Sequence, residues 1–440
     1  MQQLQGTAQP VGGYDADTEI LTHAGWKPFA KLSDDDEVAT RSETGLFQWQ
    51  VPTARESYPF DGQMIEFRNK SIDLLVVPDH PMLVRKPIPY GIKHPYADGL
   101  DMHLRPASRM AQTPEAQWHV PATSRWCPGD WPAEFCLPGW EADRRHPAHE
   151  AATKWLAAYL TQEWTPSAQV IAAYKAEGIS EKAYMAARKN LGITSRFFGG
   201  FGHEAWWEVG APTREYVPSS GHYAPMREFR IPMKAFCAFL GIYIAEGWVR
   251  LDRNDIIIAQ FVTSRHMPAI CDILSATGLR WNYDERNGKF TTSHKTLAPW
   301  LRENAGMKAR NKRVPDGYKD LPPGYLSEML RGMMMGDGHE TEGGQRCYTT
   351  TSIRLADDVQ EIFQKIVLNG VVTSHDMSKY AGAGFGGKVV RTSYVVRERK
   401  RPAHLLPKAA WADYHGTVYH ATVPNGAVYV RRNGKPLWSG

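Results

Sequence analysis

The pattern of hydrophobic and polar positions changes character along the chain. Residues 13–125 carry short apolar runs bounded by turn residues, with no long helical period between them. Runs of this length and spacing are typical of the strands of a compact β domain. We therefore predict strands at 18–21, 37–39, 64–67, 74–77 and 82–84.

Residues 145–215 instead show apolar positions at helical spacing. Ser180 is placed to cap the last of three helices, and Thr165 or Ser167 to cap the second. A glycine-rich turn at 199–202 then separates two aromatic-rich runs. Three helices followed by a hairpin are the pattern of a small α+β winged helix-turn-helix. The predicted helices span 151–160, 167–177 and 181–191.

Residues 230–400 contain an internal repeat. FLGIYIAEG at 239–247 and LRGMMMGDG at 330–338 each open a succession of strands and an amphipathic helix. A period this long excludes a solenoid of short repeats. It predicts a pseudo-symmetric α/β domain of two αββαββα halves. Residues 403–440 return to a β pattern with Asn-Gly turn signals, which predicts one β domain split by everything between.

Composition narrows the class of protein further. Of 440 residues, 42% are hydrophobic and 11% aromatic, and the formal net charge is +5. These values exclude a disordered chain, a collagen and a coiled coil, and the length suits two to four domains. The N-terminus has no signal-peptide pattern, the longest apolar run is too short to span a bilayer, and the five cysteines have no metal-binding spacing. We expect reduced thiols inside a cell and no membrane contact.

The repeat places one acid after each motif helix. Small residues four apart share a helix face and let two helices pack closely, so Glu246 and Asp337 would meet at the same end. A helix C-terminus and a second acid both disfavour a carboxylate. A hard cation resolves both problems. We therefore predict that the two acids hold Mg²⁺, with Mn²⁺ as a substitute, and support phosphodiester hydrolysis. The small residues are Gly241, Ala245, Gly332 and Gly336.

The alternative is a pair of exposed helix-end acids without function. One such segment alone would favour that interpretation, but two segments at matched positions of a repeat argue against it.

FLGIYIAEG and LRGMMMGDG resemble the motif of the LAGLIDADG homing endonucleases at the small and acidic positions, over roughly residues 230–402. The resemblance implies cleavage of long, specific double-stranded DNA sites with short 3′ overhangs, by a monomer with two pseudo-symmetric half-sites. Its sheets would form a saddle in the major groove, where Arg, Lys and Gln read bases. Each candidate could equally contact phosphate or only solvent. The candidate contacts are Arg253, Gln260, Thr263, Arg265, Tyr283, Arg286, Lys289, Thr291, Arg346, Tyr348, Thr350, Lys379, Lys388, Arg391 and Arg397.

The same resemblance implies a lysine at the end of the last strand of each half. Such a lysine would polarise the attacking water or stabilise the charged phosphate. The matching position in the first half is Lys295. In the second half it is Lys400, with Arg399 and Arg401 as alternatives.

Residues 178–202 and the tryptophan pair after them resemble the winged-helix module of phage and plasmid primases and replication proteins. In that fold the third helix enters the major groove and the hairpin contacts phosphates. The alternative is an ordinary three-helix module with a solvated basic face. The candidate DNA contacts on the third helix are Lys182, Tyr184, Arg188 and Lys189.

Residues 13–32 with 76–85, and residues 416–440, resemble the two halves of a Hint domain, the all-β fold of self-splicing inteins. An endonuclease set between these halves is the usual intein architecture. The boundaries that follow are 1–12 for a flank or tag, 13–140 and 403–440 for the Hint parts, 145–215 for the winged helix and 230–402 for the endonuclease.

By register with that family, the residues that splicing needs are missing. The first intein residue would be Gly13, which carries no nucleophile, and Val77 replaces the threonine that pairs with His80. His420 stands where variants without a first nucleophile place a cysteine, and the chain stops at Gly440, before the expected asparagine. We therefore interpret His80 as a structural histidine, and the losses as natural degeneration or as mutation and trimming.

Together these observations predict a phage-type intein homing endonuclease in the cytoplasm of a bacterial or phage-infected cell. Three alternatives stay open: a splicing intein as the main activity, a non-cleaving LAGLIDADG protein that binds DNA or RNA, and a scaffold without activity. The intact acids oppose the last two, and the missing splicing residues oppose the first.

Overall fold

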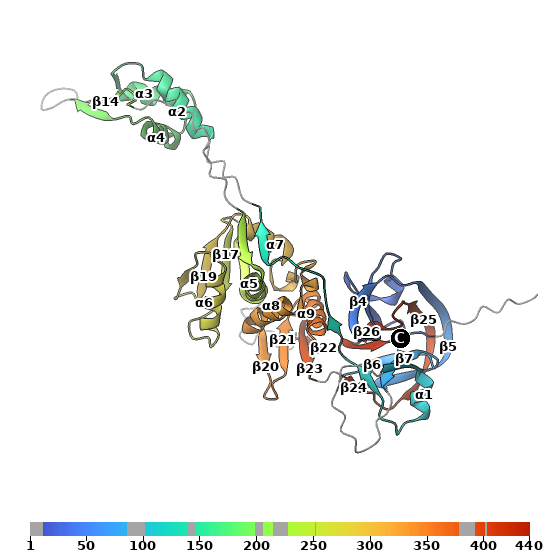
Figure 1. Cartoon of the computed structure of the whole chain (residues 1–440). Coiled ribbons are helices and arrows are strands. Elements are labelled where there is room, and N and C mark those ends of the chain that lie inside the picture. The colour runs from blue at the N-terminus through green and yellow to red at the C-terminus, as the bar shows by residue number, and fades with distance from the viewer. Residues whose placement is uncertain are drawn as a thin grey trace, which may run out of the picture. The chain divides into compact units, whose positions relative to one another are not determined.

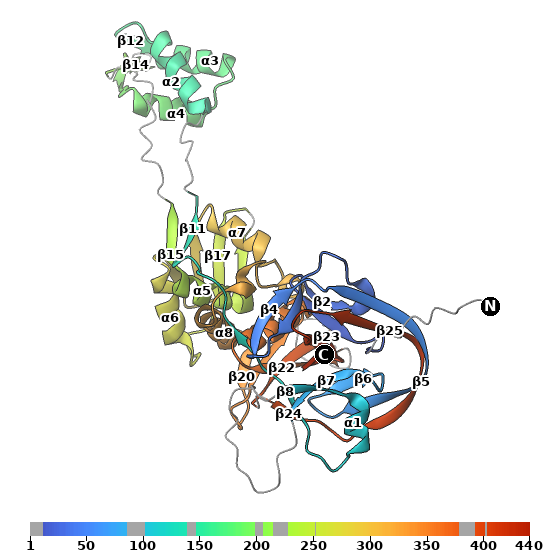
Figure 2. The ribbon, with the colours of Figure 1, turned by 45° about the vertical axis from the view of Figure 1, so that its right-hand side comes forward.

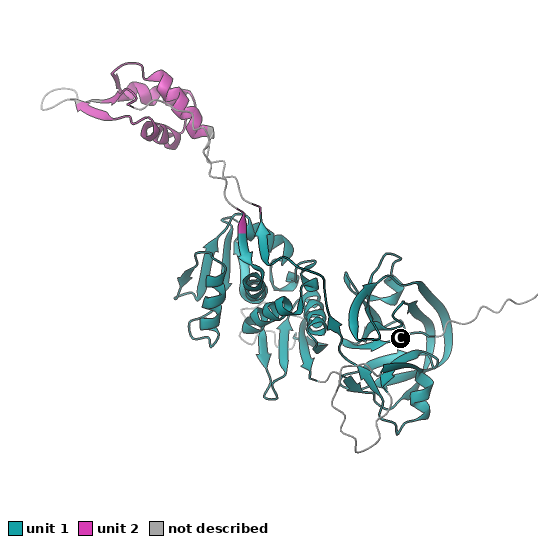
Figure 3. Cartoon of the chain, viewed as in Figure 1, with its two compact units in different colours: residues 1–137, 230–440 teal, residues 138–229 magenta. Residues whose placement is uncertain are grey.

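The computed structural model divides the chain into two units. The first comprises Met1–Leu137 and Arg230–Gly440, and the second comprises Pro138–Phe229 (Figure 3). Each unit has a hydrophobic core of its own. The residues that the structure describes are 12–85, 102–138, 147–198, 206–213, 228–250, 252–377, 392–400 and 403–440.

The two ends of the chain build one β domain within the first unit (Figure 2). β5 (Ala54–Arg68) pairs antiparallel with β25 (Ala410–Thr422) along its length. β26 (Val428–Arg432) lies beside both β1 (Glu19–Thr22) and β3 (Val38–Arg41). Each strand predicted from the N-terminal pattern overlaps an observed one.

The other elements of the β domain are short. They are β2 (Gly25–Pro28), η1 (Phe29–Lys31), β4 (Leu46–Gln50), β6 (Asp73–Val76), β7 (Pro81–Arg85), β8 (Met102–Pro106), α1 (Ala107–Gln112), β9 (His119–Pro121), β10 (Arg125–Trp126), β24 (Ala403–Leu405) and β27 (Lys435–Ser439). The strand orders are β10-β4-β3-β1-β26-β27 with β2 beside β1, then β24-β9-β7-β8, and β25-β5-β6. Apolar side chains from all three sheets meet in one core.

The repeated region forms two α/β halves (Figure 1). The first half contains α5 (Met233–Glu246), β16 (Gly247–Arg250), β17 (Asp255–Ala259), α6 (Met267–Ala276), β18 (Asn282–Asp284), β19 (Lys289–Ser293) and α7 (Leu297–Asn304). The second contains α8 (Pro323–Gly336), β20 (Gly338–Glu340), β21 (Arg346–Thr350), α9 (Ile353–Lys365), β22 (Asn369–Asp376) and β23 (Thr392–Arg399). The connector between them holds η2 (Ala309–Asn311) and η3 (Tyr318–Asp320).

Both halves use the same sheet topology. The strand orders are β16-β17-β19-β18 and β20-β21-β23-β22, so the first two strands after each motif helix form a hairpin in both. The first half is αββαββα, as predicted. The second half departs from the prediction, because the described chain passes from β23 into β24 of the β domain without a final helix. None of the helices described in these ranges is long and apolar enough to cross a membrane.

A short strand pair flanks the first motif helix. β11 (Glu134–Leu137) pairs with β15 (Phe229–Pro232) in a two-stranded sheet. Phe135 stacks on Phe236 of α5, with ring centroids 3.6 Å apart. The chain therefore reaches the repeated region before residue 138, where the second unit begins.

The polar face of α9 is buried between the second half and the β domain. Gln360, Glu361, Gln364 and Lys365 are all at most 1% exposed. Gln360 Nε2 donates to Gly434 O at 2.9 Å, and Arg431 Nη1 donates to Gln360 Oε1 at 2.9 Å. Buried polar groups cost free energy unless they are bonded. The hydrogen bonds from α9 to Arg431 and Gly434 avoid this cost and hold the second half against the β domain.

The second unit contains three helices and a small sheet. Its elements are α2 (Pro147–Tyr159), β12 (Trp164–Pro166), α3 (Ser167–Ala176), α4 (Glu181–Asn190), β13 (Ser195–Phe198) and β14 (Trp206–Gly210), with strand order β12-β14-β13. Leu156, Val170, Tyr174 and Ala187 lie in its core. The three helices and the hairpin occur where the sequence pattern placed them, while β12 was not predicted.

The helix caps of this unit agree with the prediction at one helix only. The Ser180 hydroxyl accepts a hydrogen bond from the Ala183 amide and caps α4, as predicted. The predicted cap of α3 by Thr165 or Ser167 is wrong. Pro166 is the N-cap residue there, without a side-chain bond, because Thr165 pairs with Val209 in the sheet.

Candidate active site

The two motif helices touch backbone to backbone. A Cβ on Gly241 of α5 would lie 2.1 Å from Met329 O, and a Cβ on Gly332 of α8 would lie 2.2 Å from Ala238 O. Any side chain at either position would force the helices apart. Glycine costs about 1 kcal/mol in a helix interior, and this close approach is the packing reason for its presence.

This packing brings both acids to one pocket. Glu246 is the last residue of α5, and Asp337 is the C-cap residue of α8. A Cβ on Gly336 would lie 3.0 Å from Glu246 Oε1. Glu246 and Asp337 both line a pocket of about 490 Å³. Glu246 is partly buried and Asp337 is exposed. Among the described residues, neither carboxylate has a hydrogen bond or an ion pair.

Both carboxyl groups hold a proton more tightly than usual. Burial raises the pKa of Glu246. Desolvation by the surrounding protein, and then the charge of Glu246, raise the pKa of Asp337 to about 7. Asp337 still reaches solvent, which screens part of this repulsion. Two acids that share a site without a cation repel each other, so binding of a cation would relieve the repulsion.

Lys312 lines the same pocket, and no sequence pattern predicted it. Its Nζ donates to Tyr243 O at 2.9 Å and to Gly247 O at 2.8 Å. The same atom lies 3.8 Å from the centroid of the Tyr243 ring. Burial lowers the pKa of Lys312 to about 7, against the opposing effect of the Asp337 charge. An amino group that protonates near neutral pH is therefore held at the pocket wall by carbonyl oxygens and a ring face.

The connector between the halves fixes Lys312 in place. Gly306 has a φ of +78°, and a Cβ there would lie 1.9 Å from Asn311 O, so only glycine fits this turn. The Ser352 hydroxyl at the start of α9 donates to Lys312 O at 2.8 Å. Lys308, which also lines the pocket, has φ 65° and ψ 147°, a conformation that residues with side chains rarely adopt. Strained residues of this kind concentrate at functional sites.

The donors at this pocket suit a hard divalent cation. Two carboxylates line one pocket that is open to water, and no counter-charge of the described structure is bonded to them. The Thr351 hydroxyl, also in the pocket wall, is buried without a hydrogen-bond partner in the described structure. No group of three His, Cys, Asp or Glu in the described residues could hold a metal. Oxygen ligands completed by water are the preference of Mg²⁺ rather than of Zn²⁺.

The structure does not bring the two predicted lysines to this pocket. Lys400 donates to Gly343 O at 2.7 Å, in the turn at the far end of β20 from Asp337. Lys295 is exposed in the segment before α7. The lysines that line the pocket are Lys308 and Lys312. The connector between the halves, and not the strand ends, therefore supplies the lysines that line this pocket.

The candidate DNA contacts of the sheets separate into groups. Lys289 and Thr291 alternate with the buried Phe290 along β19, so both point away from the core. Arg397 is the outward residue of β23 between the buried Val396 and Glu398. The exposed turn and loop candidates are Arg253, Thr263, Arg265 and Arg286, and the partly buried ones are Gln260 and Tyr283. Lys379, Lys388 and Arg391 lie outside the described residues.

Arg346 is not on the outward face that carries Arg397. It stands opposite Glu398 across the β21–β23 register, with Nε 3.8 Å from Glu398 Oε2. Successive strand residues point to opposite faces, so Arg346 shares the face of the buried Tyr348. It lines a second groove, of about 690 Å³, together with Arg265 and the α8 residue Met334. Tyr348, which is 0% exposed on that face, is a core residue, so its predicted base contact is wrong, whereas Thr350 is 7% exposed and lines the pocket of Glu246 and Asp337.

In the second unit, one of the four predicted helix contacts is a core residue. Tyr184 is 4% exposed and stacks on Tyr174 with ring centroids 4.3 Å apart. It packs inward because it follows Ala183 and precedes Ala187 on the buried stripe of α4. Lys182 and Lys189 are exposed, whereas the Arg188 guanidinium donates to the Ser195 hydroxyl of β13.

The predicted splicing remnants converge in the β domain. The Gly13 amide donates to His80 Nδ1 at 3.2 Å, and His80 Nε2 lies 2.9 Å from Ser439 Oγ. A Cβ on Gly12 would lie 2.9 Å from His420 Nδ1. The Gly440 amide donates to Pro81 O at 3.0 Å. Residues near both ends of the chain therefore meet around one buried histidine.

The bonds of His80 define its proton state. Nδ1 accepts from an amide, so the remaining ring proton lies on Nε2 and points to Ser439. Burial, and then the charge of His420, lower the pKa of His80 well below its usual value. His80 is therefore neutral, and its unprotonated nitrogen, Nδ1, faces the Gly13 amide rather than the Ser439 hydroxyl.

No protein-family profile matches the chain. The chain is 21% identical to the DNA-directed RNA polymerase subunit beta C-terminal section of Stigeoclonium helveticum, covering 96% of this chain and 36% of that protein. It is 24% identical to a DNA polymerase of Thermococcus kodakarensis over 43% of this chain and 12% of that protein. A short segment is 37% identical to an ATP-dependent Clp protease proteolytic subunit of Chlamydomonas moewusii, over 16% of this chain and 7% of that protein. The chain thus spans about a third or less of the curated relatives it matches.

The similar solved structures include homing endonucleases and an intein, at low scores. The homing endonuclease I-DmoI in complex with its target DNA and magnesium matches with a TM-score of 0.27 and 10% identity, covering 38% of this chain and 89% of that chain. The N-terminal LAGLIDADG domain of WhiA matches with a TM-score of 0.24 and 9% identity, over 37% and 75%. A splice-inactive class 3 split intein matches with a TM-score of 0.20 and 18% identity, over 25% and 63%.

Proposed function

We propose that this protein is a divalent-metal-dependent endonuclease that cleaves a specific double-stranded DNA site. The observation that carries the proposal is the pair Glu246 and Asp337. They lie in one solvent-accessible pocket at the ends of two helices in backbone contact, without a bonded counter-charge in the described structure. Such a pair costs stability, so a function must explain why it is there.

Three residues of the pocket have roles in this proposal. The carboxylates of Glu246 and Asp337 would hold Mg²⁺, or Mn²⁺ in its place. A bound cation would supply a Lewis acid for the phosphate oxygens and lower the pKa of a water molecule. Lys312 would place positive charge beside the scissile phosphate, held there by Tyr243 O and Gly247 O. The catalytic roles predicted for Lys295 and Lys400 are not part of this proposal, because neither lines the pocket.

The DNA would contact both units. The outward side chains Lys289 and Arg397 would face the duplex from the two sheets, and Lys182 and Lys189 would face it from the second unit. We assign the repeated region, residues 230–402, to a LAGLIDADG fold and residues 145–215 to a winged helix. A monomer suffices because one chain carries both halves. Lysine and arginine contacts to phosphates would make binding fall as salt rises.

A cleavage assay tests the proposal. The substrates are plasmids that carry the uninterrupted host-gene sequence around the insertion site, with Mg²⁺, Mn²⁺ or EDTA. The wild type is compared with Glu246→Gln and Asp337→Asn, and with Asp316→Asn, which removes an exposed acid paired to Arg354. We expect one cut by the wild type and by Asp316→Asn, and binding without cutting by the two pocket variants. Tight, specific binding without any cut by the wild type would overturn the proposal.

A second candidate function, protein splicing on a Hint fold formed by residues 13–140 and 403–440, has one observation in its favour. Gly13, His80, His420 and Gly440 converge although they are far apart in sequence. The neutral His80 that accepts from the Gly13 amide supports an inherited splicing site, whereas Gly13 lacks a nucleophile. Mass spectrometry of the chain placed between two test flanks decides between these outcomes. An intact precursor would show that the splicing activity is lost, and ligated flanks would show that the protein splices.

A further inference from the structure

The exposed face of α4 carries an apolar side chain between two lysines. Met185 is 53% exposed, although methionine is usually buried. Lys182 and Lys189, three residues before and four after it, are exposed on the same face. The opposite stripe of α4, with Ala183, Tyr184 and Ala187, packs into the core. Met185 is therefore accessible to a molecule that binds the second unit.

The charges on this helix select the partner. Lys182 and Lys189 are the exposed cations of the face, and Glu181 at the first turn is the acid of the helix. Arg188 is turned aside, because its guanidinium donates to the Ser195 hydroxyl of β13. A single thioether between two flexible ammonium groups does not form an apolar patch of the size that protein partners use. It matches a polyanion that presents one small apolar group between phosphates.

We propose that Met185 contacts the 5-methyl group of a thymine in the major groove, while Lys182 and Lys189 contact the flanking phosphates. This inference rests on the proposed DNA-binding function and names the base that the second unit reads. In the major groove, the thymine methyl is the apolar group that a base pair presents, and apolar side chains recognise it. The unbranched, polarisable methionine side chain suits such a contact.

The arrangement also explains what this helix lacks. Discrimination of guanine or adenine relies on bidentate Arg, Asn or Gln side chains. The one arginine of α4 is bonded to β13, and Asn190 at its end donates to the Thr153 hydroxyl of α2. Lys182 and Lys189 fix the position of the helix on the backbone, and Met185 is the side chain left to read a base.

Deoxyuridine interference tests this contact with the full chain. A cleavage-site duplex is synthesised with thymine replaced at random by deoxyuridine, which removes only the methyl group, and bound duplex is separated in EDTA. For the wild type we expect deoxyuridine at one or two thymines to weaken binding about fourfold, the factor that corresponds to burial of one methyl-sized group. For Met185→Ala we expect that interference to vanish at these thymines and to persist at positions read by the first unit.

Two further variants make the test specific. Met185→Leu keeps an apolar side chain of similar volume and should retain the interference. Ile171→Ala removes another exposed apolar residue, on α3 and 37% exposed, and should leave the whole interference map unchanged. An interference map that is the same for the wild type and Met185→Ala, with specific binding intact, would overturn the inference and leave the endonuclease proposal standing. Absence of specific DNA binding by the wild type would instead refute both.

Discussion

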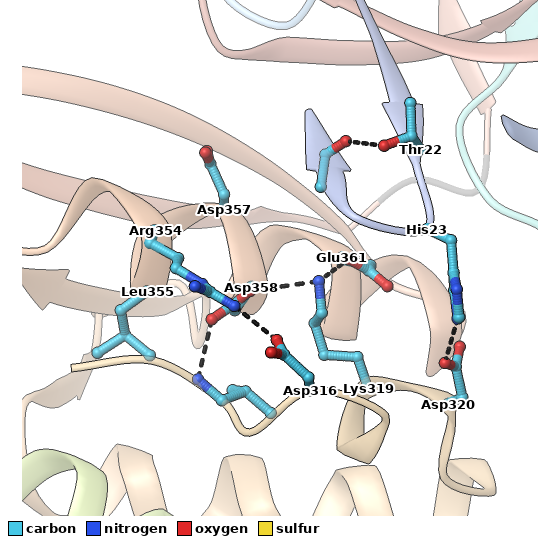
Figure 4. A network of polar contacts seen from close by, with 12 residues as sticks. Thr22, His23, Asp316, Lys319, Asp320, Arg354, Leu355, Asp357, Asp358 and Glu361 are labelled. Carbon is cyan, nitrogen blue, oxygen red and sulfur yellow. Dashed lines mark hydrogen bonds and ion pairs between the residues drawn. The ribbon is translucent and has the colours of Figure 1, made fainter. Parts of the chain in front are cut away.

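Two pairs of carboxylates in the first unit have opposite surroundings. Asp358 and Glu361 on α9 are 3% and 1% exposed, and Lys319 Nζ lies 3.3 Å from the first and 2.7 Å from the second (Figure 4). Lys365 adds a second ion pair to Glu361 at 2.8 Å. Glu246 and Asp337 are more accessible, yet no described cation bonds to either. The deeply buried pair has lysine counter-charges within the protein, and the accessible pair has none bonded to it in the described structure.

The pKa values follow this difference. Burial pushes the pKa of Glu361 up, but the charges of Lys365 and Lys319 outweigh it and leave the pKa lowered. Asp358 has weaker compensation, and burial raises its pKa to about 6. For Asp337, desolvation and Glu246 together raise the pKa to about 7. The comparison teaches that burial alone does not mark a functional acid. What sets Glu246 and Asp337 apart is that no cation of the described structure is bonded to them, and on this difference we base the proposed function.

The largest effect is expected from Asp337→Asn. Loss of one of two metal-holding carboxylates should slow cleavage at least about a thousandfold, which corresponds to about 4 kcal/mol of transition-state stabilisation. DNA affinity in EDTA should change little. Single-turnover cleavage with saturating enzyme measures this. A variant that cuts at the wild-type rate would place the chemistry elsewhere and break the comparison.

The second prediction concerns Glu361→Gln in the compensated pair. The amide would leave Lys319 and Lys365 without their shared anion, and removal of one partner of a buried ion pair costs about 3–5 kcal/mol. Urea unfolding should show this loss, while the folded fraction cuts DNA at the wild-type rate. Asp316→Asn, at an exposed pair, should cost less than about 1 kcal/mol. Cleavage lost at unchanged stability would contradict the structural role of Glu361.

The third prediction compares two buried lysines. Lys312→Met should slow cleavage about a hundredfold, because positive charge beside the phosphate is lost. It should lower stability less than loss of a buried ion pair does, since only two hydrogen bonds to carbonyl oxygens are removed and burial already lowers the pKa of Lys312 to about 7. The matched variant Lys365→Met should lower stability, since Glu361 loses a partner, and should leave cleavage by the folded fraction unchanged. Normal cleavage by Lys312→Met together with slow cleavage by folded Lys365→Met would contradict the prediction and give Lys365 the catalytic role.

The smallest effect is a difference in the pH dependence of stability without metal. The folded pKa of Asp337, about 7, lies above its unfolded value of 3.8, so the folded state binds the extra proton between these values. Its contribution to stability therefore falls as pH rises from about 4 to 7. Solvent screening should hold the effect below about 1 kcal/mol.

Urea midpoints measured in EDTA from pH 4 to 8 test this prediction. The decrease in stability as the pH rises should be smaller in Asp337→Asn than in the wild type. Glu361 has the opposite sign. Its lowered pKa contributes stability that is present above about 4.5 and is lost as pH drops through the folded pKa. That acid-side loss should persist in Asp337→Asn. Identical curves for the two proteins between pH 4 and 7 would show that the Asp337 pKa is not raised.

Local pattern was sufficient where burial follows from a single element. The small residues of the motif helices predicted their close contact, since glycine inside a helix needs a packing reason. The same holds for the Ser180 cap and the β strands near the N-terminus. The pairing of Glu246 with Asp337 required one more step, the assumption that matched helices pack together.

Strand faces could not be assigned from residue type alone. Arg346 and Arg397 are chemically alike, but the register of β21 against β23 puts them on opposite faces. Tyr184 was grouped with the basic residues beside it on α4, although its ring belongs to the core. In both cases the error came from choosing residues for their chemistry before their periodicity.

The sequence by itself determined most of the elements, the repeat and the positions of the two acids, because periodicity and small residues report burial within one helix or strand. The tertiary structure alone decided which lysines line the pocket of Glu246 and Asp337 and which polar helix face is buried. Lys312 lies in a connector without periodicity, and its place depends on the Gly306 turn and the Ser352 hydroxyl. The polar face of α9 resembles a solvated surface in sequence, yet strands from both ends of the chain cover it. Contacts between residues so distant along the chain depend on how complete elements pack, which no local pattern records.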